Sequence, residues 1–182
     1  MTFEKTVTLK DGRNCLLRNG VTSDGKAVLE VFNRTHEETD YLLTYSDENR
    51  FTVSQEADFL QRKTDSANNV EIIAVVDDVV AGTAGIDALG MRDKIKHRAV
   101  FGIAITKEFW GLGIGKYLME ACIECAREAG YLQLELEVVA ENERAVEMYR
   151  RAGFIEYGRN PKAFRLRTGE YQELIDMRLE LK

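Results

Sequence analysis

One stretch of the sequence decides the fold: residues 101–116 read FGIAITKEFWGLGIGK. The apolar run 100–106 predicts a strand, and segment 113–128, with apolar residues at helical spacing, predicts a helix. The glycine-rich turn 111–115 joins the two directly. Glycines let consecutive backbone N–H groups converge, and a helix N-terminus adds a partial positive charge. The stretch therefore predicts a site for an anion, most naturally a pyrophosphate.

The spacing of the glycines excludes two common phosphate-binding motifs. A dinucleotide-binding fingerprint, G-x-G-x-x-G, ends on Lys116 instead of glycine when it is counted from Gly111. A phosphate loop, G-x-x-x-x-G-K-[ST], would have Trp110 at its first glycine position and Tyr117 at its last position. What remains is a turn that binds an anion in another way or that uses its glycines only for close packing.

Outward from this stretch, short apolar runs alternate with helical patterns. Hairpin turns are expected at Asp11-Gly12 and Asp77-Asp78, and residues 52–55 (TVSQ) form a capping box at a helix start. The order predicts an α/β fold with a mixed, mostly antiparallel sheet, one parallel strand–helix–strand crossover and helices on both faces. We expect a single domain, 1–182. The expected strands are 7–9, 15–17, 70–76, 79–86, 100–106, 132–139, 154–157 and 171–181, and the expected helices are 23–38, 52–62, 113–128 and 143–151.

The composition is that of an ordinary globular chain. Its 182 residues include 25 Lys and Arg against 31 Asp and Glu, a net charge of −6, and 45% are hydrophobic. The acidic balance argues against a nucleic-acid surface, which needs clustered basic residues. No apolar run approaches the ~18 residues that span a membrane, and the N-terminus shows no apolar signal segment. We therefore expect a cytoplasmic protein without nucleic-acid or membrane partners.

The three cysteines are expected to be reduced thiols. Cys122 and Cys125 form a C-x-x-C, but both fall on the apolar stripe of the expected helix 113–128, so packing is a better interpretation than a redox pair. A zinc site would need two further ligands, and His36 and His97 stand alone. We expect no metal.

Two blocks of the sequence resemble a known family. Residues 110–115 (WGLGIG) resemble the acetyl-CoA signature of the GNAT superfamily of N-acetyltransferases, R/Q-x-x-G-x-G/A. Residues 142–154 (NERAVEMYRRAGF) resemble its second block, N-x-x-A-x-x-x-Y-x-x-x-G-F. The blocks have the order and separation of the family, and the resemblance covers about residues 99–158. It implies an acetyl-CoA-dependent acyltransferase of the GNAT fold.

The resemblance also implies roles for individual residues. Tyr149 would protonate the leaving thiolate, and both Asn142 and Tyr149 would face the pantetheine arm and the thioester. The remaining cofactor contacts would come from backbone groups. The pantetheine would pair with Ile103, Ala104 and Ile105, and the pyrophosphate would be wrapped by N–H groups of Gly111, Leu112, Gly113, Ile114, Gly115 and Lys116.

One position departs from the family pattern. Trp110 stands where the family has Arg or Gln. A cationic or amide contact at the phosphate edge is therefore lost or supplied by another residue, for which Lys116 is our candidate.

Acetyl transfer to an amine also needs a base, because the amine must be neutral when it attacks. Glu137 lies in the alternating strand 132–139, five residues before Asn142 and twelve before Tyr149. The same spacing carries the general base in the ribosomal-protein N-terminal acetyltransferases, which this segment resembles. Glu135 shares the face and is the rival, and a carboxylate buried in a central strand is costly without a role or a partner.

The sequence thus predicts an N-acetyltransferase that moves an acetyl group from acetyl-CoA to a primary amine by direct transfer. The alternative is a non-catalytic acyl-CoA-binding or regulatory module on the same fold. The acceptor is expected to be a small-molecule amine or a protein N-terminus, and a homodimer is left open. No motif identifies the acceptor.

Overall fold

A computed structural model describes residues 1–181. No helix within them combines the length and the apolar composition needed to cross a membrane. The α-helices are α1 (Gly25–Glu38), α2 (Val53–Asp65), α3 (Ile114–Glu128) and α4 (Glu143–Arg151). The strands are β1 (Glu4–Thr8), β2 (Asn14–Asn19), β3 (Val70–Val76), β4 (Val79–Ala88), β5 (Arg98–Ile105), β6 (Gln133–Val139), β7 (Ile155–Arg165) and β8 (Tyr171–Glu180).

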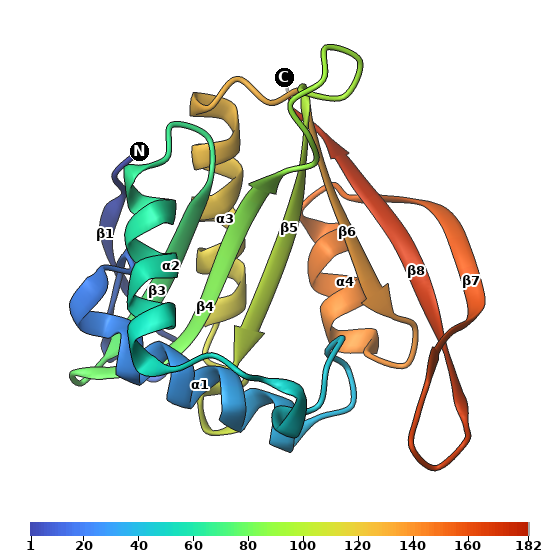
Figure 1. Ribbon diagram of the computed structural model, residues 1–182, viewed down its shortest axis with the longest axis horizontal. Coiled ribbons are helices and arrows are strands. Elements are labelled where there is room, and N and C mark those ends of the chain that lie inside the picture. The colour runs from blue at the N-terminus through green and yellow to red at the C-terminus, as the bar shows by residue number, and fades with distance from the viewer. Residues whose placement is uncertain (182) are drawn as a thin grey trace.

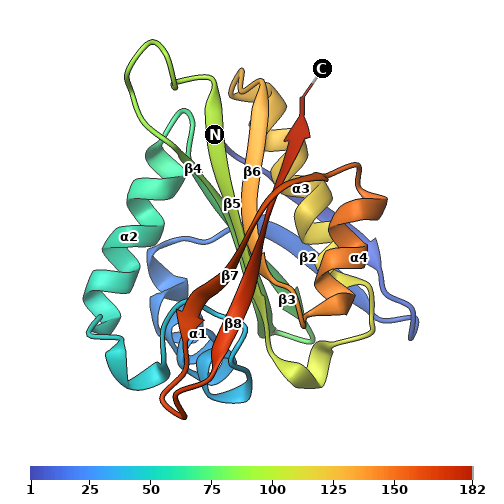
Figure 2. The same cartoon turned by 90° about the vertical axis from the view of Figure 1, so that its right-hand side faces the viewer.

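The strands form one sheet in the order β1-β2-β3-β4-β5-β6-β8-β7. Every neighbouring pair is antiparallel except β5 and β6, which are parallel and are joined through α3. Helices α1 and α2 lie against one face of the sheet, and α3 and α4 lie against the other (Figure 2). The predicted mixed sheet, with its parallel crossover and helices on both faces, is confirmed.

The parallel pair is short, and this shapes the molecule. Pairing between β5 and β6 stops at Val100 and Glu135, although β5 continues to Ile105 and β6 to Val139. Below that point the two strands diverge (Figure 1). The edge of β5 that faces β6 is therefore left without a strand partner, and its backbone polar groups need another partner.

Local sequence signals explain several boundaries. The Thr52 hydroxyl accepts a bond from the Gln55 N–H (3.3 Å), and the Gln55 side chain accepts one from the Thr52 N–H (2.9 Å), so the predicted capping box opens α2. Asp77 and Asp78 have φ values of 49° and 64°, the backbone of a tight turn between β3 and β4. Both predictions are confirmed.

The prediction of β7 is wrong in extent. The expected strand 154–157 runs on to Arg165 and crosses Pro161. Proline cannot donate to a ladder, but β7 is an edge strand, and its pairing with β8 is irregular between Asn160 and Phe164. The predicted start of strand 132–139 is also wrong by one residue, because β6 begins at Gln133 and Leu132 is exposed.

The two cysteines of the C-x-x-C are packing residues. Cys122 and Cys125 are fully buried in the main core between α3 and the sheet, as expected from their place on the apolar stripe. Inside such a core a free cysteine acts as a small hydrophobe.

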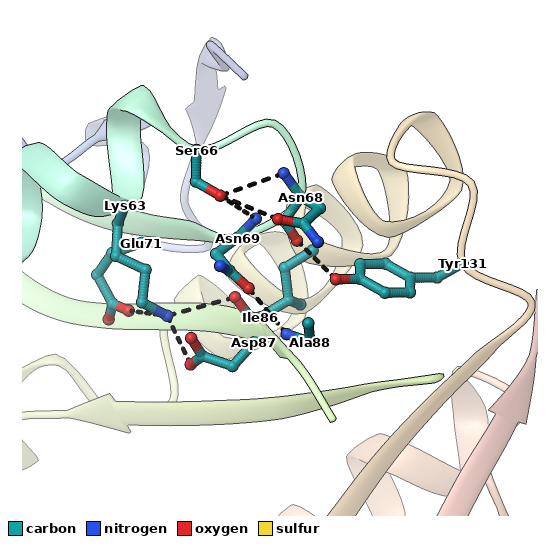
Figure 3. Close-up of polar contacts among 9 residues, drawn as sticks. All are labelled: Lys63, Ser66, Asn68, Asn69, Glu71, Ile86, Asp87, Ala88 and Tyr131. Atoms are coloured by element: carbon teal, nitrogen blue, oxygen red, sulfur yellow. Dashed lines mark hydrogen bonds and ion pairs between the residues drawn. The ribbon is translucent and has the colours of Figure 1, made fainter. Parts of the chain in front are cut away.

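A partly buried ion cluster fixes the end of α2 to the sheet (Figure 3). The Lys63 ammonium lies 2.5 Å from Asp87 and 3.9 Å from Glu71, and it donates to the Ile86 carbonyl (3.3 Å). Burial raises the pKa of Glu71 to about 7, although Lys63 opposes the shift. The charged form of Glu71 is therefore a cost to the folded state at neutral pH.

The free energy of unfolding should accordingly depend on pH through Glu71. As pH rises from about 5 to about 8, the free energy of unfolding of the wild type should fall by about 1–3 kcal/mol relative to that of Glu71→Gln. The reason is that the folded state releases the Glu71 proton at a higher pH than the unfolded chain does. The measurement is urea unfolding of both proteins at each pH, with Glu30→Gln on the exposed face of α1 as the control. A constant difference across the range would contradict the assignment.

Candidate active site

The gap between β5 and β6 opens into a cleft of about 1090 Å³. Its walls come from these two strands, the glycine turn, α3, α4, the segment after α1 and the β7–β8 hairpin. Every predicted site residue lines this cleft except Leu112, whose side chain packs against the core. The cleft therefore brings together segments from both ends of the chain.

The glycine turn presents free backbone donors to the cleft. Gly111 and Gly113 have φ values of 87° and 98°, which side chains rarely adopt. Within residues 1–181, no backbone hydrogen bond is donated by the N–H groups of residues 111–116. Consecutive free N–H groups at the start of α3 form the expected anion site.

A lysine that sequence analysis did not identify lies beside this turn. The Lys10 N–H donates to the Leu112 carbonyl (3.1 Å), so the β1–β2 hairpin is fixed against the turn, and the Lys10 side chain lines the cleft. No ion pair of Lys10 occurs within the part of the chain that the structure describes. Residues 10 and 112 are far apart in the sequence and are brought together by the tertiary fold, so no local sequence signal could identify Lys10.

Trp110, which stands where the family has Arg or Gln, makes one hydrogen bond and two cation–π contacts. Its indole N–H donates to the Ile105 carbonyl (2.6 Å). The ring lies 5.5 Å from the Arg144 guanidinium and 5.7 Å from the Lys107 ammonium, within the range of cation–π attraction. Arg144 lines the cleft, so Trp110 positions a cation there without supplying one. Lys116 also lines it, but it lies 3.6 Å from Glu120.

The predicted pantetheine strand lies on the unpaired edge of β5. Ile103, Ala104 and Ile105 pair with β4 on one side only, and all three line the cleft. This edge can accept an extended chain as an added strand.

Asn142 caps α4. Its side-chain oxygen accepts a bond from the Ala145 N–H (3.3 Å) while the residue lines the cleft. The cap fixes the start of α4 and so the direction in which Tyr149, two turns later, points.

Tyr149 is buried, 6% exposed, and lines the cleft. Its ring packs edge-on against Phe101 (6.1 Å between centroids) and at a tilt against Phe154 (5.8 Å). The hydroxyl has no hydrogen-bond partner among residues 1–181, and burial raises its pKa well above the ordinary value. A protonated phenol with an unused hydrogen bond therefore faces the cleft.

The two candidate bases differ in their surroundings. Glu135 is buried and receives two hydrogen bonds from Arg98, one of 2.6 Å, and a third from Gln133 (3.1 Å). Glu137 is exposed to the cleft and forms no ion pair within the described residues. The sequence left open which of the two carboxylates is the base, and the structure gives them different surroundings: Glu135 is buried and paired, and Glu137 is exposed.

The far wall of the cleft is fixed by a contact between two loops. The Arg167 guanidinium forms two hydrogen bonds with Asp47 (2.6 and 2.9 Å), and its backbone N–H donates to the Tyr45 hydroxyl (3.0 Å). These contacts join the β7–β8 hairpin to the segment between α1 and α2. Tyr41, Leu42 and Phe164 of the two segments line the cleft.

Comparison with known proteins gives consistent matches. A family model described as "Acetyltransferase (GNAT) family" matches residues 29–154. The L-amino acid N-acetyltransferase AaaT of Escherichia coli is 30% identical over 118 residues, which cover 64% of this chain and 72% of that protein. A GNAT-family acetyltransferase structure from Streptococcus pneumoniae has a TM-score of 0.87 at 27% identity and covers 91% of this chain and 99% of its own. The structure of yncA from Salmonella typhimurium with its cofactor acetyl-CoA shares the fold, with a TM-score of 0.82 at 17% identity and coverage of 93% and 95%.

Proposed function

The chain belongs to the acetyltransferase (GNAT) family, and on that premise we propose that it moves an acetyl group from acetyl-CoA to a primary amine by direct transfer. We assign this activity to one domain, residues 1–182. The observation that supports it best is the cleft itself, where Glu137 and Tyr149 both present polar groups that have no partner among residues 1–181.

The residues of the cleft fit acetyl-CoA. The free N–H groups of residues 111–116 would hold the pyrophosphate, and Lys10 and Arg144 would add positive charge beside it. The unpaired edge of β5 at residues 103–105 would bind the pantetheine amides. Bound acetyl-CoA supplies the acetyl thioester that reacts with the amine.

Two side chains of the chain would move protons. Glu137, exposed in the cleft, would take the proton of the incoming ammonium so that the nitrogen can attack the thioester carbon. As the C–S bond breaks, the Tyr149 hydroxyl would donate its proton to the leaving sulfur. Glu135 is a poor base because Arg98 already neutralises it.

An amine panel tests the proposal directly. The purified protein is mixed with acetyl-CoA and each amine, and free thiol is measured over time. At least one primary amine should release thiol faster than water does. Stabilisation by acetyl-CoA without release for any amine would instead support the non-catalytic acyl-CoA-binding module.

Gly113→Val should weaken CoA binding about tenfold or more. Valine is strained at φ 98°, and its bulk would enter the space where the free N–H groups meet. The measurement is the rise of the thermal midpoint with CoA concentration, which follows from mass action. Gly169→Val is the matched control, since Gly169 has φ 95° in the β7–β8 hairpin with open space around it. Stabilisation by ATP or NAD but not by CoA would refute the assignment of the turn.

A further inference from the structure

We propose that the acceptor is a short aliphatic diamine, held through its second ammonium group by Asp176. This inference rests on the proposed acetyl transfer and adds a substrate class and a specificity residue. It follows from the distribution of unpaired charge in the cleft and on the adjoining strand β8.

The positively charged side chains that line the cleft and have no carboxylate partner among residues 1–181 gather in one part of it. Lys116 lies near Glu120 (3.6 Å), and Arg151 bonds to Glu147 (2.8 Å), so these cations are matched. Among the described lining residues, Lys10 and Arg144 have no carboxylate partner, and both lie beside the glycine turn or at the start of α4. They face the end where cofactor phosphates would bind.

Elsewhere, the lining residue Glu137 has a second carboxylate beside it: Asp176 lies next to the cleft on β8, outside its lining. Asp176 of β8 lies directly across from Glu137 of β6, so the two side chains leave the same face of the sheet. Leu174, which shares that face of β8, lines the cleft. Neither carboxylate has an ion-pair partner within residues 1–181. Like charges directly opposite each other destabilise a sheet, and a bound cation would relieve that cost.

One of the two arginines of this face is fully engaged, because Arg98 is bound to Glu135. Arg178 lies over the Tyr157 ring (5.7 Å) and 3.4 Å from Glu180, and its buried Nε has no hydrogen-bond partner among the described residues. An ammonium would therefore meet two carboxylates that have no ion pair within residues 1–181, whereas the carboxylate of an acceptor would meet only Arg178, which already lies beside Glu180.

A neighbouring glycine leaves room for the Asp176 carboxylate. One Asp176 carboxylate oxygen lies 2.7 Å from the point that a Cβ on Gly158 would occupy. Only glycine at that position of β7 leaves the carboxylate where it is. The pKa of Tyr157 is raised, first by burial and then by the negative charges of Glu135 and Asp176.

A second, independent feature marks this region as a ligand site. The Tyr149 hydroxyl has no partner in the described part of the chain although the residue is only 6% exposed, and the residue lines the same cleft. The reacting nitrogen would lie between this hydroxyl and Glu137. Neighbouring strands are about 4.8 Å apart, so Asp176 lies about one strand spacing beyond Glu137. A chain of four or five methylenes covers such a separation, and Leu42, Leu89 and Phe164 offer apolar walls for it.

Three acceptors of equal length test the inference: 1,5-diaminopentane, 1-aminopentane and 5-aminopentanoate. They differ only in the far group, which is positive, neutral or negative. We expect kcat/KM to fall in that order, by about tenfold or more from the diamine to the neutral amine, a factor equivalent to ~1.4 kcal/mol. Equal values, or a preference for 5-aminopentanoate or for a peptide N-terminus, would overturn the inference.

Variants assign the preference to a residue. Asp176→Asn should reduce the ratio of diamine to monoamine kcat/KM to about 1–3, and Asp176→Glu should retain most of it. Glu173→Gln removes a carboxylate from the other face of β8, where it pairs with Arg159 (3.5 Å), and should leave the ratio unchanged. An unchanged ratio in Asp176→Asn, with its thermal midpoint preserved, would overturn the assignment.

The same experiment separates the two proposals. Thiol release with all three amines but without charge preference refutes the diamine inference and leaves acetyl transfer standing. No release with any amine in the wider panel, while acetyl-CoA still raises the thermal midpoint, refutes both.

Discussion

Tyr149→Phe should lower the turnover number for acetyl transfer by about 100-fold or more, the range expected when a positioned proton donor is lost. The substitution keeps the ring, which packs on Phe101 and Phe154, and removes a hydroxyl that bonds to no other group among residues 1–181. The fold should therefore be unaffected. Acetyl-CoA affinity should change little, because the phosphate and pantetheine contacts come from other residues.

Steady-state thiol release and the acetyl-CoA-dependent thermal shift measure the two effects separately. Tyr131→Phe is the matched control, because its hydroxyl bonds to the Asn68 carbonyl (3.0 Å) at the opposite end of the sheet (Figure 3). It should lower stability and leave turnover unchanged. Equal losses of binding and turnover in Tyr149→Phe would mean that the residue only packs against the cofactor, and unchanged turnover would remove it from the mechanism.

Local sequence patterns predicted the elements of this fold because each depends on residues close together in the chain. The alternation along residues 132–139 identifies β6, and the capping box at Thr52 opens α2. The glycine turn was predictable for the same reason, since strand, turn and helix lie within one 16-residue stretch.

The electrostatics of the site could not be predicted in this way. Glu135 and Glu137 look equivalent in the sequence, yet only Glu135 meets Arg98, through the parallel register of β5 and β6. That register is set by the crossover through α3 and has no local signal. Lys10 and Asp176 were missed for the same reason, because strands far apart in the sequence bring them to the site.

Glu137→Gln should lower turnover about 100-fold near neutral pH, within the range for loss of a general base. The acceptor enters as an ammonium, and without Glu137 its proton must leave to water. At high pH the amine is deprotonated in solution and no longer needs the base. The variant should therefore recover much of its activity as pH rises, and the low-pH limb of its rate profile should shift upward in pH.

Glu135→Gln separates a base from a structural carboxylate. It removes the partner of Arg98 and leaves a partly buried guanidinium without its carboxylate, so we expect a lower thermal midpoint and a low-pH limb like that of the wild type. Recovery at high pH in Glu135→Gln but not in Glu137→Gln would mean that Glu135 is the base and that the assignment to Glu137 is wrong. If neither variant changes the pH profile, proton removal belongs to water or to a residue outside this strand. The exposure of Glu137 in the cleft and the ion pair of Glu135 together predict that only Glu137→Gln will show the recovery.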